Sequence, residues 1–100
     1  MDSYKQALSF LGLLRRGRGL YLGDEAKGKK AALVVVAKDA KTGSYKSARE
    51  VAGKLGVPLI EASSKEELGA ALGKNEVAYL SIKEGKAAKA FLAKLDERRN

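Results

Sequence analysis

Positively charged side chains are concentrated in the first half of this 100-residue chain, where they form two clusters. The clusters consist of Arg15, Arg16 and Arg18, and of Lys27, Lys29 and Lys30. Residues 1–49 contain eleven Lys and Arg against four Asp and Glu, a net charge of +7, whereas residues 50–100 contain nine against eight, a net charge of +1. A concentrated positive surface attracts polyanions, of which nucleic acid is the most common in a cell. The pattern favours a nucleic-acid partner, although such residues also serve as a solvated surface that keeps a protein soluble.

Gly23, Asp24 and Glu25 lie between these clusters and have the chemistry to contact nucleobases. A glycine lets a ligand approach the backbone closely, and free N–H groups at a helix start can bind an anion. Carboxylates there repel phosphate but accept hydrogen bonds from guanine N1 and N2 or cytosine N4. Phosphates would be contacted by the flanking cations, namely Arg18, Lys27, Lys29 and Lys30. We expect these cations to converge beside the helix start. The alternative role of the two carboxylates is to stabilise the dipole of the helix instead of contacting a base.

The chain contains neither cysteine nor histidine. Disulfide bonds, thiolate zinc sites and cysteine nucleophiles are therefore excluded, as are the usual general base and the commonest metal ligand. An enzyme would depend on Lys38, Asp39 or tyrosines, which form no recognisable catalytic set. The spacing of Gly17, Gly19 and Gly23 is one residue too long for a dinucleotide fingerprint, and it precedes a strand instead of following one. We expect no catalytic residues, no metal, no cofactor and no small-molecule substrate.

No apolar stretch approaches the roughly 20 residues that a transmembrane helix requires, and the first residues lack the pattern of a secretory signal. We therefore expect a cytoplasmic protein with no membrane partner. One hundred residues is the length of one domain, so we expect residues 1–100 to form a single domain, as a monomer.

Hydrophobic periodicity predicts alternating helices and strands. The expected helices span residues 4–16, 42 or 44 to 55, 64–73 and 85–98, with a helix start at 23–26 that ends at 27–30. The expected strands span residues 20–22, 31–37, 59–60 and 77–82. The strand at 31–37 is an uninterrupted apolar run, typical of a strand buried on both faces in a largely parallel sheet. This alternation predicts an α/β class protein, a three-layer α/β/α sandwich.

Five segments occur in an order that is similar to a known family. They are Leu11–Leu14 leading to Gly19-Leu20, then Gly23–Ala26, Leu33–Ala40, Gly56–Pro58 and Leu68–Gly73. Together they resemble the superfamily of kink-turn RNA-binding ribosomal proteins, the L7Ae type, and especially its small stand-alone bacterial branch. The resemblance extends over nearly the whole chain. It implies an α/β/α sandwich around a mixed four-stranded sheet, and non-enzymatic binding of structured RNA, such as a kink-turn or internal loop in ribosomal or regulatory RNA.

The resemblance also implies an RNA site where the helix after the first strand meets two neighbouring loops. Family members use a Gly, an Asn-Glu pair and a Lys there to contact tandem sheared G·A pairs. Gly23 matches the Gly, Asp24 and Glu25 lie near the Asn-Glu positions, and Lys27 or Lys29 lies near the Lys. The loop at residues 73–77 would pack on an extruded nucleotide. The expected RNA-binding residues are Arg18, Gly23, Asp24, Glu25, Lys27, Lys29, Lys30, Lys38, Lys74 and Asn75.

The chain departs from the family pattern in two respects. Members carry a longer helix between the Gly-acidic start and the buried strand, whereas here only residues 27–30 intervene. Asp24 replaces the Asn, and Lys74 and Asn75 are polar where apolar residues would cover the base. The alternative function is a protein-interaction module that has lost specific RNA binding, and its surface would be the exposed part of residues 20–22.

Overall fold

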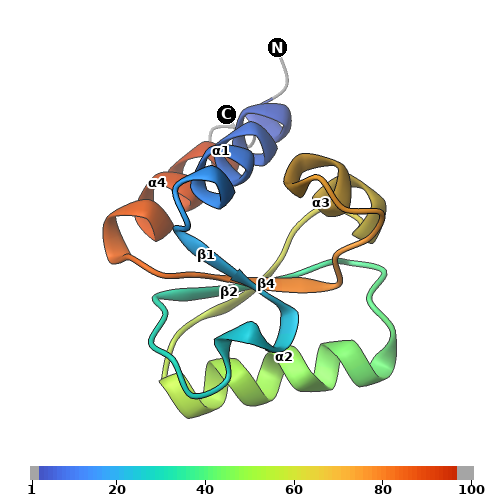
Figure 1. Cartoon of the computed structure of the whole chain (residues 1–100), viewed down its shortest axis with the longest axis vertical. Coiled ribbons are helices and arrows are strands. Elements are labelled where there is room, and N and C mark those ends of the chain that lie inside the picture. The colour runs from blue at the N-terminus through green and yellow to red at the C-terminus, as the bar shows by residue number, and fades with distance from the viewer. Residues whose placement is uncertain (1–2, 97–100) are drawn as a thin grey trace.

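The computed structural model describes residues 3–96, in which four helices and four strands alternate (Figure 1). The helices are α1 (Ser3–Arg16), α2 (Thr42–Leu55), α3 (Lys65–Leu72) and α4 (Gly85–Asp96). The strands are β1 (Leu20–Leu22), β2 (Leu33–Val36), β3 (Leu59–Glu61) and β4 (Tyr79–Ile82), and a single 3-10 turn, η1 (Gly23–Ala26), follows β1. The predicted elements are confirmed apart from their ends, and the expected extension of the last helix to residue 98 lies outside the described residues.

The four strands form one mixed sheet in the order β1-β4-β2-β3. Only β2 and β3 are parallel, because β4 is antiparallel to both of its neighbours. The mixed sheet is confirmed, whereas the expectation of a largely parallel sheet is wrong. An apolar run such as that of β2 shows that both faces of the strand are buried, but it does not show the direction of the neighbouring strands. Helices cover both faces of this sheet although most of its strand pairs are antiparallel.

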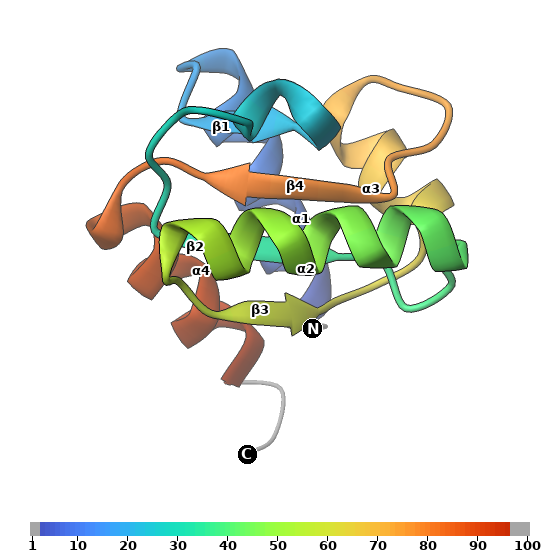
Figure 2. The same cartoon turned by 90° about the horizontal axis from the view of Figure 1, so that it is seen from below.

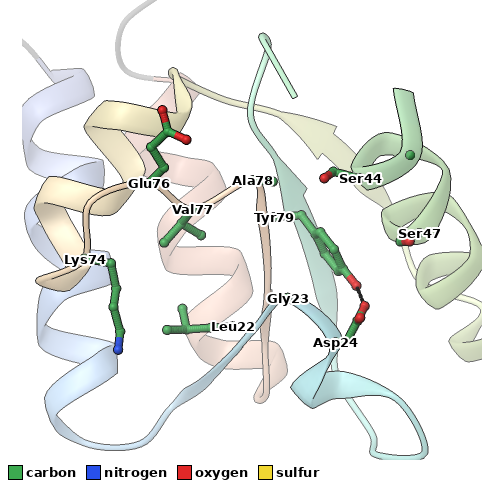
Figure 3. Close-up of a pocket in the computed structure, with 11 residues that line it drawn as sticks. Leu22, Gly23, Asp24, Ser44, Ser47, Lys74, Glu76, Val77, Ala78 and Tyr79 are labelled. Atoms are coloured by element: carbon green, nitrogen blue, oxygen red, sulfur yellow. Dashed lines mark hydrogen bonds between the residues drawn. The ribbon is translucent and has the colours of Figure 1, made fainter. Parts of the chain in front are cut away.

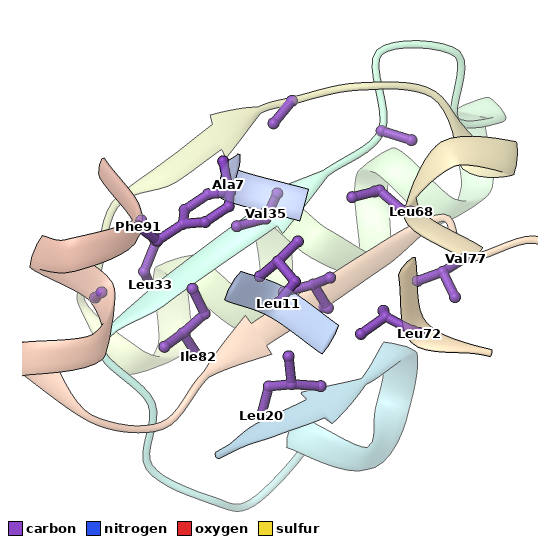
Figure 4. Close-up of a cluster of buried hydrophobic side chains, with 14 residues drawn as sticks. Ala7, Leu11, Leu20, Leu33, Val35, Leu68, Leu72, Val77, Ile82 and Phe91 are labelled. Carbon is purple, nitrogen blue, oxygen red and sulfur yellow. The ribbon is translucent and has the colours of Figure 1, made fainter. Parts of the chain in front are cut away.

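Helices cover the sheet unequally, since α2 lies on one face and α1, α3 and α4 lie on the other (Figures 1 and 2). Side chains alternate between the two faces along a strand. Val34 and Val36 accordingly join the hydrophobic cluster beneath α2, whereas Leu33 and Val35 join the larger cluster with Phe91 (Figure 4). This arrangement confirms the three-layer α/β/α sandwich. Among the described residues, no helix is both long and apolar enough to cross a membrane.

The strand register brings several connecting segments to one end of the sheet. Leu22 pairs with Leu80, and Val36 pairs with Tyr79, so the last residues of β1 and β2 lie beside the first residues of β4. The turn η1 and the loop before β4 therefore meet at this end, together with the start of α2 (Figure 2).

Candidate nucleic-acid interface

A hollow of about 390 Å³ lies at this end of the sheet, and we call it the strand-end hollow (Figure 3). Three segments form it: the turn from β1 into η1, the first turns of α2 and the loop before β4. Its lining residues are Leu22, Gly23, Asp24, Gly43, Ser44, Ser47, Lys74, Glu76, Val77, Ala78 and Tyr79. Figure 3 shows Lys74 and Glu76 on one side, Ser44 and Ser47 on the other, and Gly23 and Asp24 between them.

Gly23 gives the hollow an open stretch of backbone. Its φ of 51° lies in the left-handed region, which residues with a Cβ atom adopt only at a cost. A Cβ atom built on Gly23 would have no other atom within 4 Å, apart from its chain neighbours. The glycine is therefore required by the conformation of the turn, not by crowding, and the space in front of its backbone is free for a ligand.

The Asp24 carboxylate is held in place by one hydrogen bond and one ion pair. The Tyr79 hydroxyl donates a short hydrogen bond to Asp24 Oδ1, and Lys27 Nζ lies 3.7 Å from the same oxygen. The Asp24 side chain nevertheless remains 68% exposed. Burial raises the pKa of the Tyr79 hydroxyl, and the bond to Asp24 with its negative charge raises it further, so that the hydroxyl stays a donor. The result is a carboxylate of fixed orientation that is still accessible from solvent.

Glu25 performs a different task from Asp24. Its Oε1 atom accepts a hydrogen bond of 2.8 Å from the backbone N of Leu22, which closes the start of η1. Glu25 thus has a structural role, through a hydrogen bond and not through the dipole stabilisation that the sequence suggested. The single turn of η1 is also too short to act as an anion-binding helix end, because the dipole of a helix grows with its length. The expected capture of an anion by free N–H groups at this helix start is therefore not supported.

The loop that forms the opposite wall packs directly on α3. A Cβ atom on Gly69 would lie 2.7 Å from the carbonyl oxygen of Asn75, so only glycine permits this contact. The backbone N of Val77 also donates to the Lys65 oxygen at 3.1 Å. These contacts fix the loop, which exposes Lys74 along the hollow.

The expected cations do not converge on one point. Lys74 lines the strand-end hollow, whereas Arg18 and Lys29 line a second hollow along the outer edge of β1. Lys27 borders a small hollow of about 120 Å³ between η1 and α2, although it also reaches Asp24. The other expected residues line none of these three hollows: Lys30, Lys38 and Asn75. The expected single group of cations is thus wrong, since Arg18 and Lys29 lie beside the first residues of β1 and Lys74 lies beyond its last residue.

Sequence reasoning missed three residues of the strand-end hollow that carry hydroxyl groups: Ser44, Ser47 and Tyr79. Tyr79 is 55 positions from Asp24, and only the pairing of β4 with β1 and β2 brings the two together. The serines lie half-buried in the first turns of α2, where they carry no distinctive motif. A correct prediction of the strand order would have shown that these residues lie close together.

The surface expected for a protein-interaction module is not open. Leu20 is buried, and Tyr21 and Leu22 are half-buried. Two lysines also lie over the Tyr21 ring, with Nζ atoms 4.5 and 5.3 Å from its centroid. Among the described residues, the exposed large hydrophobic side chain is Leu13, which lies on α1 and not on β1.

The fold and this arrangement agree with a family assignment. Residues 24–92 match the model of the ribosomal protein L7Ae/L30e/S12e/Gadd45 family, so the chain belongs to that family. The resemblance seen in the sequence is thereby confirmed.

Solved structures also resemble this chain. A protein of unknown function from Bacillus halodurans C is 27% identical, with a TM-score of 0.77 over 90% of this chain and 96% of that one. The Giardia lamblia 15.5kD RNA binding protein is 20% identical, with a TM-score of 0.66 over 99% of this chain and 90% of that one. The second likeness shows a shared fold. No curated protein sequence matches the chain.

Proposed function

We propose that this protein binds structured RNA without catalysis, and that the strand-end hollow receives the nucleotides of a kink-turn or a related internal loop. The observation that carries the proposal is the meeting of an open Gly23 backbone, a fixed Asp24 carboxylate and Lys74 in one hollow. The family assignment, the net charge of +8 and the structural likeness to an RNA-binding protein support it.

Each of these groups has a distinct role in the proposal. The RNA backbone approaches Gly23, where no side chain intervenes. Asp24 accepts hydrogen bonds from the N1 and N2 groups of a guanine, since an ionised carboxylate is an acceptor only. Lys74 contacts a phosphate, and its loop packs against an extruded nucleotide. The serines of α2 supply hydroxyl groups that donate or accept as the bases require.

The absence of catalysis is supported by what the candidate groups do. Asp39 Oδ1 accepts a hydrogen bond of 2.8 Å from the backbone N of Lys65, which stabilises the start of α3. The raised pKa of Tyr79 keeps its hydroxyl protonated, and a protonated phenol is no general base. Both groups thus have structural functions.

We also propose the setting in which binding occurs. Residues 1–100 act as one RNA-binding domain, a monomer in the cytoplasm, and ribosomal RNA and regulatory transcripts are its candidate partners. Light scattering across a salt series tests the monomer, because an interaction module would instead form a salt-insensitive dimer. Sequencing of cross-linked transcripts identifies the RNA.

The specific function is tested by titrating the protein with two RNAs of equal length at a fixed salt concentration. One contains a kink-turn, and in the other Watson–Crick pairs replace its tandem G·A pairs. We expect clearly tighter binding to the kink-turn, because the hollow accepts unpaired base edges that a regular helix conceals. Equal affinity for both RNAs would leave only electrostatic attraction and would refute the specific proposal.

A further inference from the structure

A second hollow, of about 360 Å³, lies along the outer edge of β1, and we call it the edge hollow. It is lined by Arg15, Arg18, Leu20, Tyr21, Glu25, Lys29 and Lys83. Its four cations come from three separate segments: the end of α1, the loop after η1 and the residue after β4. Against the single carboxylate of Glu25, they give this lining a formal charge of +3.

Tyr21 organises two of these cations. The Nζ atom of Lys83 lies 4.5 Å from the centroid of the Tyr21 ring, and that of Lys29 lies 5.3 Å from it. Both distances are within the range of cation–π attraction. The backbone of Lys83 is also fixed, because its N atom donates to the oxygen of Gly19 at 3.0 Å. Both ammonium groups are thereby held beside the same ring.

Arg18 is placed in the edge hollow by an unfavourable backbone conformation. Its φ of 57° is left-handed, and the position after a helix end that takes this conformation is usually a glycine. The neighbouring Gly17 does not have a positive φ, so Arg18 and not the glycine takes this conformation. The N atom of Arg18 donates to the oxygen of Arg15 at 3.1 Å, so both guanidinium groups start from the same turn. A strained residue of this kind indicates that the side chain has a use beyond the turn itself.

The edge hollow suits phosphates better than bases. The aromatic ring that would stack on a base is already covered by lysines, whereas single-strand binders present such rings to the nucleotides. Glu25 keeps its negative charge while it accepts the hydrogen bond of 2.8 Å from the Leu22 backbone, but four cations outnumber it in this lining. The edge hollow therefore presents four cations around a space of about 360 Å³.

The two hollows adjoin the same segment of chain. Leu20 and Tyr21 line the edge hollow, and Leu22 and Gly23 line the strand-end hollow. Three residues of strand cover about 10 Å, which is about the axial length of three base pairs in a duplex. One RNA molecule can therefore reach both.

We propose that the edge hollow binds the phosphodiester backbone of an RNA stem that leads away from nucleotides held in the strand-end hollow. The inference rests on the proposed function, since it assigns the two hollows to one RNA. The inference adds Arg15, Lys83 and Tyr21 to the RNA interface, and it assigns a different role to each hollow. The strand-end hollow selects the RNA, and the edge hollow provides affinity that depends on salt.

The test compares two double variants by fluorescence anisotropy with a kink-turn RNA that has full-length stems, over a range of salt concentrations. Lys29→Gln with Lys83→Gln removes two cations from the edge hollow. Lys86→Gln with Lys89→Gln removes two exposed lysines of α4 that line neither hollow and are not among the expected RNA-binding residues. Both variants have the same net charge, so they differ only in where the charge is lost.

We expect the edge variant to bind about tenfold more weakly, and the slope of log K against log salt to fall by about 1.8, or 0.9 for each lost contact. The control variant should change affinity less than twofold. Arg18→Gly provides a second measure, because glycine relieves the strained φ and thermal unfolding should not worsen while binding weakens. Equal losses in the edge and control variants, or an unchanged slope, would overturn the inference.

A failure of the edge hollow is distinguishable from a failure of the proposed function. If the wild type prefers the kink-turn but the edge variants bind like the control, the edge hollow is refuted alone. If the wild type does not discriminate the two RNAs while the edge variants lose slope, the strand-end proposal fails and the phosphate site remains.

Discussion

Replacement of Gly23 by alanine tests the proposed site with one added methyl group. A left-handed conformation costs an L-residue about 1–2 kcal/mol, and the reduced freedom of the unfolded chain returns about 0.4–1 kcal/mol. The net loss of stability is then about 1 kcal/mol, or a Tm decrease of about 4–8 °C for a domain of this size. No clash adds to this cost, because no other atom lies within 4 Å of the new methyl group.

A matched control is available at Gly56, which ends α2 with a φ of 67° and also has no atom within 4 Å of an added Cβ. Gly56→Ala should lose stability by the same amount, but Gly56 does not line the strand-end hollow. Calorimetry first establishes that the two variants have similar Tm values. Titration with kink-turn RNA then follows at a temperature where both are fully folded.

We expect Gly23→Ala to bind the kink-turn at least tenfold more weakly, a loss of about 1.4 kcal/mol. Gly56→Ala should retain the affinity of the wild type. Such a difference can arise only if RNA approaches the backbone of Gly23. Wild-type affinity in Gly23→Ala would mean that the RNA lies elsewhere, and the reasoning from the open glycine would be refuted.

Three further predictions concern the groups around the hollow. Tyr79→Phe keeps the buried ring but removes the hydrogen bond to Asp24, and urea unfolding should show a loss of about 1 kcal/mol. The pKa of Tyr79 is raised on folding, so the hydroxyl contributes its full stability below about pH 10 and loses it as pH rises through the folded pKa. The difference in unfolding free energy between wild type and Tyr79→Phe should therefore be smaller in a urea titration at pH 11 than in one at pH 8. Gly69→Ala drives a Cβ into the Asn75 backbone and should cost about 1–3 kcal/mol, whereas Gly53→Ala in the open interior of α2 should be neutral or stabilising in the same thermal scan.

Much of the fold could be predicted because its signals are local. The helix expected from residue 64 begins where the Ser64 side chain accepts a hydrogen bond from the Glu67 backbone, and the helix expected to end at residue 55 is followed by Gly56 in the left-handed conformation. Strand direction was not predictable in the same way. The apolar residues of β2 report burial alone, and the antiparallel insertion of β4 between β1 and β2 depends on contacts distant in sequence.

The candidate site was only partly predictable for the same reason. The opening at Gly23 follows from residue type and position, and so does the proximity of Asp24. The separation of the cations into two hollows does not follow from the sequence, since Arg15 and Lys83 meet only after β4 pairs with β1. The hydrogen bond from the Leu22 backbone to Glu25 was not predicted either, because charge patterns do not show which local group a carboxylate contacts.

The strand order has a consequence for synthesis of the protein. The strand that separates β1 from β2 in the sheet is β4, the last strand in the chain. During translation, β1 has no sheet partner until residues 79–82 leave the exit tunnel, and both hollows stay incomplete until then. A chain without residues 79–83 has neither hollow complete, and RNA binding at either hollow should require this segment.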